Sequence, residues 1–103
     1  MTPAELDALI DELTTDAYGD DEQLSCFLVG AEEALVGGEP ASIVGVDVEI
    51  LGVAPGPDAR TGLLARVRRD KRSYEVALAD LSFASGSELE DVVAAYRRWQ
   101  GRS

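Results

Sequence analysis

Acidic side chains are the residues of this sequence whose type and spacing suggest chemistry. Six of them lie between residues 16 and 33, and no basic residue occurs near them in the sequence. Like charges about 4 Å apart repel by roughly 1 kcal/mol per pair even in water. A divalent cation would relieve this repulsion, and Ca²⁺ fits best because it accepts six to eight oxygen ligands in a loose geometry. The candidate metal ligands are Asp16, Asp20, Asp21, Glu22, Glu32 and Glu33.

The spacing of these acids does not match the calcium loop of an EF-hand. If Asp16 takes the first position, the sixth is Asp21, where the loop needs glycine. The twelfth position is then Phe27, where the loop needs a bidentate glutamate. Any Ca²⁺ site must therefore have another design, either assembled from separate segments or held by surface charge.

The same acids also have simpler interpretations, which the sequence leaves open. Residues 20–22 lie in the first turn of an expected helix, where carboxylates cap backbone amides and meet the positive end of the helix dipole. Glu32 and Glu33 suit a solvated helix face. Asp47 and Glu49 suit the solvent face of a strand, where they can pair with arginines of a neighbouring hairpin.

Composition excludes several classes of function. The chain has no histidine and one cysteine, which rules out Cys/His zinc sites and Ser-His or Cys-His catalysis within one chain, and we expect no enzyme. The net charge of -11 disfavours nucleic acid as a partner, because phosphate binding depends on Lys and Arg. One basic cluster exists, and we expect it to offset the acidic half of the protein. It consists of Arg66, Arg68, Arg69, Lys71 and Arg72.

The length of 103 residues predicts a single domain over residues 1–103, and a hydrophobic content of 46% is enough for a core. The lone Cys26 excludes an internal disulfide, which favours a reducing cytoplasm. No apolar run approaches the roughly 20 residues that a membrane span needs. The beginning of the chain also lacks the pattern of a secretory signal. We therefore expect a cytoplasmic protein without a membrane partner.

Helix signals occur three times and position the acids. Thr2 to Glu5 and Ser87 to Glu90 read as capping boxes, and Asp20 with Gln23 marks a further start. Apolar residues at helical spacing follow each start. The predicted helices span about 3–15, 20–36 and 87–100.

Between the second and third helices the pattern changes to strands. Val44, Val46, Val48 and Ile50 alternate with polar residues, and two further runs flank a polar turn. The predicted strands span about 43–53, 62–69 and 73–79, with flexible pieces at 36–41 and 55–61. The fold class is therefore α+β, with two N-terminal helices, a small antiparallel sheet and a C-terminal helix. The sequence does not decide whether this sheet is open or barrel-like.

Three segments together resemble a known family. They are residues 15–23 (Thr-Asp-Ala-Tyr-Gly-Asp-Asp-Glu-Gln), residues 45–50 (Gly-Val-Asp-Val-Glu-Ile) and residues 95–99 (Ala-Tyr-Arg-Arg-Trp). This arrangement is similar to that of the small acidic calcium-binding proteins first known from heterocyst-forming cyanobacteria. The resemblance implies a compact α+β protein that binds Ca²⁺ without EF-hands, as a buffer or a sensor. Residues 36–41 depart from the apolar segment that the family has after its second helix.

Two hypotheses follow. The first is non-enzymatic Ca²⁺ binding through clustered surface carboxylates, with Asp16, Asp20, Asp21, Glu22, Glu32 and Glu33 as ligands. The alternative is an acidic protein-interaction module, of inhibitor or immunity type, that docks on a basic partner protein. In that case the acidic half of the chain would steer association, and the association rate would fall as salt is added.

Overall fold

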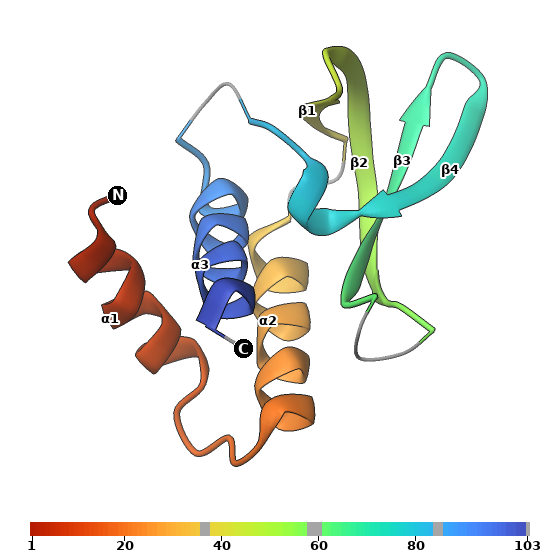
Figure 1. Ribbon diagram of the computed structural model, residues 1–103. Coiled ribbons are helices and arrows are strands. Elements are labelled where there is room, and N and C mark those ends of the chain that lie inside the picture. The colour runs from red at the N-terminus through yellow and green to blue at the C-terminus, as the bar shows by residue number, and fades with distance from the viewer. Residues whose placement is uncertain (36–37, 58–60, 84–85, 103) are drawn as a thin grey trace.

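The computed structural model describes residues 1–35, 38–57, 61–83 and 86–102. Three helices and one antiparallel sheet confirm the α+β class, and the order of the elements is as expected apart from one additional strand (Figure 1). None of the helices in these residues is long and apolar enough to cross a membrane. The elements are α1 (Pro3–Leu13), α2 (Asp20–Ala34), β1 (Glu39–Ile43), β2 (Val46–Pro55), β3 (Leu63–Arg69), β4 (Arg72–Ala77), the 3-10 helix η1 (Leu78–Asp80) and α3 (Glu88–Arg102).

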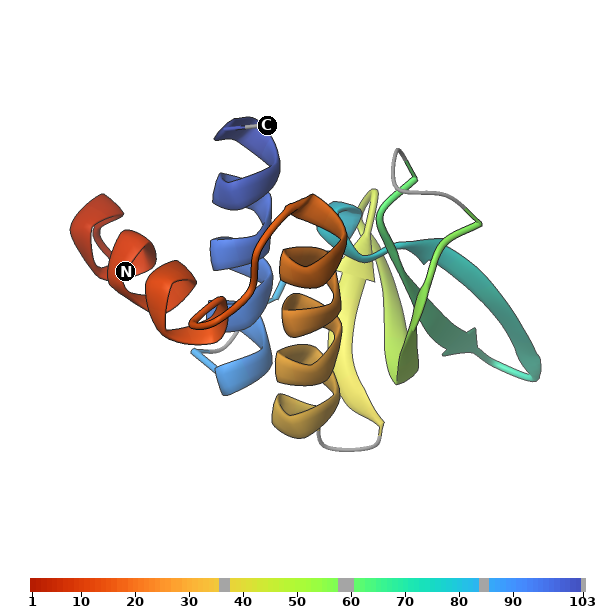
Figure 2. The ribbon, with the colours of Figure 1, turned by 90° about the horizontal axis from the view of Figure 1, so that it is seen from below.

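The helices form one layer and the sheet forms the other (Figure 2). The apolar sides of the two layers meet in a core in which Phe27 of α2 and Tyr96 of α3 are buried, with ring centroids 5.7 Å apart. The ring of Trp99 lies 5.2 Å from that of Phe27. Arg98 of α3 also holds α1, since its Nε donates to Asp7 Oδ1 at 2.7 Å. Helix α3 is thus the central element of the helical layer.

The sheet has the strand order β1-β2-β3-β4, and every neighbouring pair is antiparallel. Alternate residues of β2 and β3 face the helices, which buries Val48, Ile50, Ala65 and Val67. In the described residues no ladder of hydrogen bonds joins β4 to β1. An isolated bridge between Ser42 and Ser82 connects β1 to the segment that follows η1. The sheet is therefore open, and the barrel-like closure does not occur.

The first predicted strand, 43–53, is wrong at its beginning. Residues 39–43 form β1, a strand that lies where a flexible piece was expected, and Val44 and Gly45 form the turn into β2. Both turn residues have positive φ, 49° and 77°, which suits a tight hairpin. Val44 is consequently 96% exposed, so it does not share the buried face of Val48 and Ile50.

The remaining boundaries differ from expectation for local reasons. Helix α1 ends at Leu13 instead of residue 15, and the Thr14 and Thr15 hydroxyls donate to carbonyls one turn back. The last predicted strand, 73–79, ends at Ala77 because Leu78 begins η1. Helix α2 ends at Ala34 instead of residue 36, because Leu35 already has an extended backbone with φ -70° and ψ 123°. Val36, at the predicted end of this helix, lies outside the described residues, as do residues 58–60 of the predicted loop.

Candidate metal centre

The six predicted ligands are all exposed, and the structure divides them between the two ends of α2. Asp20, Asp21 and Glu22 occupy the first turn, with Asp16 in the preceding connection. Glu32 and Glu33 occupy the last turn. Ten residues separate Glu22 from Glu32, which places the two groups about 15 Å apart along the helix axis. A single ion therefore does not contact both groups.

The group at the start of α2 is partly engaged in capping. Glu22 Oε2 accepts a hydrogen bond of 2.8 Å from the Tyr18 backbone N–H. The N-cap residue is Gly19 with a φ of 95°, so the expected cap by Asp20 is wrong and Asp20 begins the helix. All three first-turn acids lie at the positive end of the helix dipole, which stabilises them without a metal.

The group at the end of α2 lacks such compensation. Glu32 and Glu33 lie at the negative end of the helix dipole, and the last turn contains no basic residue. The helix dipole therefore disfavours both carboxylates. A bound cation would stabilise this end of the helix more than the other.

Two further carboxylates come to the same end of the helical layer. Helices α2 and α3 run antiparallel, because Trp99 Nε1 near the end of α3 donates to Gln23 Oε1 at the start of α2 at 2.7 Å. At the opposite end, the Ser87 hydroxyl just before α3 donates to Glu39 Oε2 at 3.1 Å, as Glu39 begins β1. Sequence reasoning missed Glu39 as a candidate, because residues 36–41 were expected to be a flexible piece and β1 was not predicted.

Glu90, in the first turn of α3, is the second carboxylate that sequence reasoning missed. Its side chain is half-buried, and its Oε2 atom is fully buried without a hydrogen-bond partner in the described part of the chain. A buried acceptor left without a partner costs about 1–3 kcal/mol, and a charged one costs more. The expected capping box is half formed, since Glu90 N–H donates to Ser87 Oγ at 3.1 Å.

No three His, Cys, Asp or Glu side chains gather into a metal-binding group within the described residues. The candidate carboxylates therefore lie in pairs and on exposed turns rather than in a preformed cage. An ion bound by such a pair must take its other ligands from water and backbone carbonyls, which Ca²⁺ accepts readily.

The basic cluster behaves differently from expectation. Arg68 Nη2 lies 2.8 Å from Glu49 Oε2, which confirms one pairing with the strand acids. Arg66, Arg69, Lys71 and Arg72 form no salt bridge with a described residue. The cluster therefore offsets little of the acidic half by direct contact.

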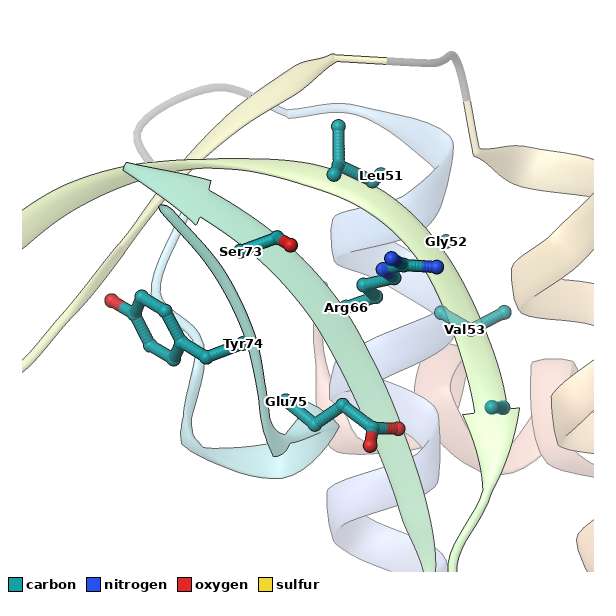
Figure 3. A pocket seen from close by; sticks show the side chains of 8 residues that line it. Leu51, Gly52, Val53, Arg66, Ser73, Tyr74 and Glu75 are labelled. Carbon is teal, nitrogen blue, oxygen red and sulfur yellow. The ribbon is translucent and has the colours of Figure 1, made fainter. Parts of the chain in front are cut away.

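The outer face of the sheet contains a hollow of about 610 Å³ beside this cluster (Figure 3). Leu51 and Val53 of β2 line it together with Arg66 of β3 and Glu75 of β4, while the Tyr74 ring points away from Arg66. Arg66 and Glu75 are register partners on adjacent strands. With one carboxylate, this hollow does not belong to the candidate metal centre.

The fold has close counterparts among solved structures. A calcium-binding protein in its calcium-binding form matches with a TM-score of 0.74 and 18% identity, over 99% of this chain and 97% of the other. The crystal structure of CcbP from Anabaena matches with a TM-score of 0.78 and 16% identity, over 97% of this chain and 92% of the other. No protein-family model matches the chain, and no curated protein does. The comparisons thus establish a shared fold over nearly the whole length of both chains.

Proposed function

We propose that this protein binds Ca²⁺ and is not an enzyme. The observation that carries the proposal is the match of nearly the whole fold to a calcium-binding protein in its calcium-binding form. The chain offers suitable ligands, because its exposed side chains are rich in carboxylates and 20 of its 103 residues are Asp or Glu. Hard oxygen donors of this kind suit Ca²⁺, whereas the chain has no histidine for a softer metal.

The ligands that we propose lie in the two groups on α2. Asp16, Asp20, Asp21 and Glu22 would serve at its start, and Glu32 and Glu33 at its end. The second group has the stronger physical reason to take up a cation, since neither a basic side chain nor the helix dipole compensates it. Because each group supplies few carboxylates, water and backbone carbonyls would complete each coordination shell.

Thermal unfolding with matched salts tests this proposal. A ligand that binds only the native state stabilises it by RT ln(1 + [L]/Kd), which is about 2.7 kcal/mol at a hundredfold excess over Kd. At constant ionic strength, millimolar CaCl₂ should raise the melting temperature more than the same concentration of MgCl₂. Equal shifts with the two salts would reduce the effect to charge screening, and the proposal would then fail.

A further inference from the structure

Strand β4 forms an open edge of the sheet, on the side of the molecule away from α1 (Figure 1, Figure 2). It pairs with β3, and no other strand pairs with it within the described residues. Successive residues of an edge strand direct their backbone N–H and C=O groups alternately toward the neighbouring strand and away from it. Alternate residues of β4 therefore offer backbone donors and acceptors to a further strand.

The turn end of this edge carries positive charge that the fold does not compensate. Arg69 of β3 and Arg72 of β4 are register partners, so they lie directly opposite each other. Like charges in this arrangement destabilise a sheet. Neither arginine forms a salt bridge with a described residue, and neither does Asp70 in the turn between them. An acidic side chain from another molecule would relieve the repulsion, which favours a partner with carboxylates.

An exposed aromatic ring lies on the same face of the sheet as these two arginines. Residues two apart in a strand point to the same side, so Arg69 shares the face of the buried Val67. Tyr74 is the register partner of Val67 and therefore lies on this face, where it is 40% exposed. A hollow of about 580 Å³ adjoins the turn and is lined by Arg69, Asp70, Lys71, Arg72 and Tyr74.

We propose that β4 is a docking edge for an extended acidic segment of a partner protein. The segment adds to the sheet as a further strand and places its carboxylates beside Arg69, Lys71 and Arg72. This inference goes beyond Ca²⁺ binding and does not depend on it. A strand fits the edge better than a lipid bilayer does, because a bilayer has no backbone groups that pair with β4.

The charge of the edge also selects among strands. Charged side chains on an edge disfavour pairing with a neutral strand, whereas an acidic strand is attracted by Lys71 and Arg72. The net charge of -11 opposes an acidic partner at long range. At about 0.15 M salt, however, charges more than about 8 Å apart are largely screened, so the charge at the turn dominates the contact.

The residues of β4 predict the pattern of the docked segment. Directly opposite residues of neighbouring antiparallel strands interact in pairs, and opposite charges, two aromatic rings or two hydroxyls make favourable pairs. The matching residues are Glu, Thr, Tyr, Thr and Val, opposite Arg72, Ser73, Tyr74, Glu75 and Val76 in that order. Read in the antiparallel direction, and with a second Glu for Lys71, this pattern gives the hexapeptide Val-Thr-Tyr-Thr-Glu-Glu with blocked ends.

Titration of the ¹⁵N-labelled protein with this peptide tests the edge. Amide resonances of residues 72–77 should shift saturably at millimolar peptide, and those of residues 39–43 in β1, at the other edge, should shift far less. A peptide with Lys in place of both Glu residues should cause clearly smaller shifts. Two further peptides, N-methylated at the odd or at the even positions, separate strand pairing from charge attraction. One of them should lose binding, because its methyl groups face β4, and the other should bind.

Two matched double variants of the protein test the role of the arginines. Arg69→Gln with Arg72→Gln removes two exposed charges from the face that the acidic residues of the peptide share. Arg66→Gln with Arg68→Gln removes two exposed charges from the opposite face of the same hairpin. Because favourable cross-strand charge pairs form on the first face alone, the first variant should raise the Kd of the peptide at least about fivefold, and the second less than about twofold.

Several outcomes would overturn the docking edge. A wild type whose β4 amides do not respond to millimolar acidic peptide refutes it, and so does equal binding of both N-methylated peptides. If the two double variants weaken binding to the same extent, long-range charge explains the effect and strand addition is again refuted. A protein that ignores the peptides but cosediments with phosphatidylserine vesicles has a lipid-binding turn instead. None of these results bears on Ca²⁺ binding, which the calcium titrations test separately.

Discussion

The hydroxyl of Tyr96 in α3 accepts a hydrogen bond of 2.8 Å from the backbone N–H of Leu63, which is the first residue of β3. Both residues are buried, at 1% exposure each. This bond joins the helical layer to the central part of the sheet across 33 positions of sequence. Gln100 Nε2, one turn further along α3, donates to the same oxygen at 2.8 Å. The tyrosine therefore fixes α3, and with it the first turn that contains Glu90, relative to the strands.

Replacing Tyr96 with phenylalanine should destabilise the protein by about 1–3 kcal/mol, because the Leu63 N–H is then buried without an acceptor. Chemical denaturation should show this loss as a lower midpoint with an unchanged slope. Tyr74→Phe is a suitable control, since Tyr74 is 40% exposed and its variant should unfold like the wild type. A Tyr96→Phe variant as stable as the wild type would show that the bond contributes nothing.

Alkaline pH should lower the stability of the folded protein through Tyr96. Burial raises the pKa of Tyr96 above its ordinary value of 10.0, although the hydrogen bond from Leu63 partly opposes the shift. The folded state therefore keeps the proton at a pH where the unfolded state has lost it. The stabilising contribution is complete below pH 10 and is lost as the pH rises through the raised pKa. Unfolding monitored between pH 9 and 11 should show a steeper loss of stability in the wild type than in Tyr96→Phe.

Gly62 precedes Leu63 and should tolerate no side chain. Its φ is 73°, and an added Cβ would overlap the Tyr96 hydroxyl. Gly45 is the matched control, because its φ is 77° and its Cβ would meet no atom within 4 Å. We expect Gly45→Ala to cost about 1 kcal/mol, since a residue with a Cβ pays roughly this amount in the left-handed region. Gly62→Ala should cost clearly more, and equal costs would contradict the close approach of α3 to this turn.

The sequence predicts the helices better than it predicts the candidate site. Thr2 and Glu5 form the expected capping box, because this motif acts within four residues and needs no tertiary contact. Strand β1 escapes prediction, since Glu39-Pro40-Ala41-Ser42-Ile43 shows no alternation and depends on its pairing with β2. The hydrogen bond between Ser87 and Glu39 joins residues 48 positions apart, so no local sequence pattern predicts it. The alternation of apolar residues wrongly includes Val44 in the strand, because Val44 is apolar but lies in the turn and is exposed.

The acids at the end of α2 should have opposite effects on stability and on Ca²⁺ affinity. Changing Glu32 and Glu33 together to glutamine removes two charges from the negative end of a helix dipole, which typically gains about 0.3–1 kcal/mol per charge. The variant should therefore melt at a higher temperature than the wild type when Ca²⁺ is absent. If the two residues are ligands, calorimetry should also show weaker binding. An unchanged affinity would remove them from the ligand set.

The most direct test of the central claim is a calorimetric titration of the wild-type protein with CaCl₂, in about 0.15 M salt and with 1 mM MgCl₂ present. This salt concentration screens exposed charges beyond about 8 Å, so a diffuse acidic surface contributes little heat. We expect saturable binding at a small whole number of sites that Mg²⁺ does not abolish. Weak heat without saturation would contradict it and would leave the acids as a diffuse charged surface.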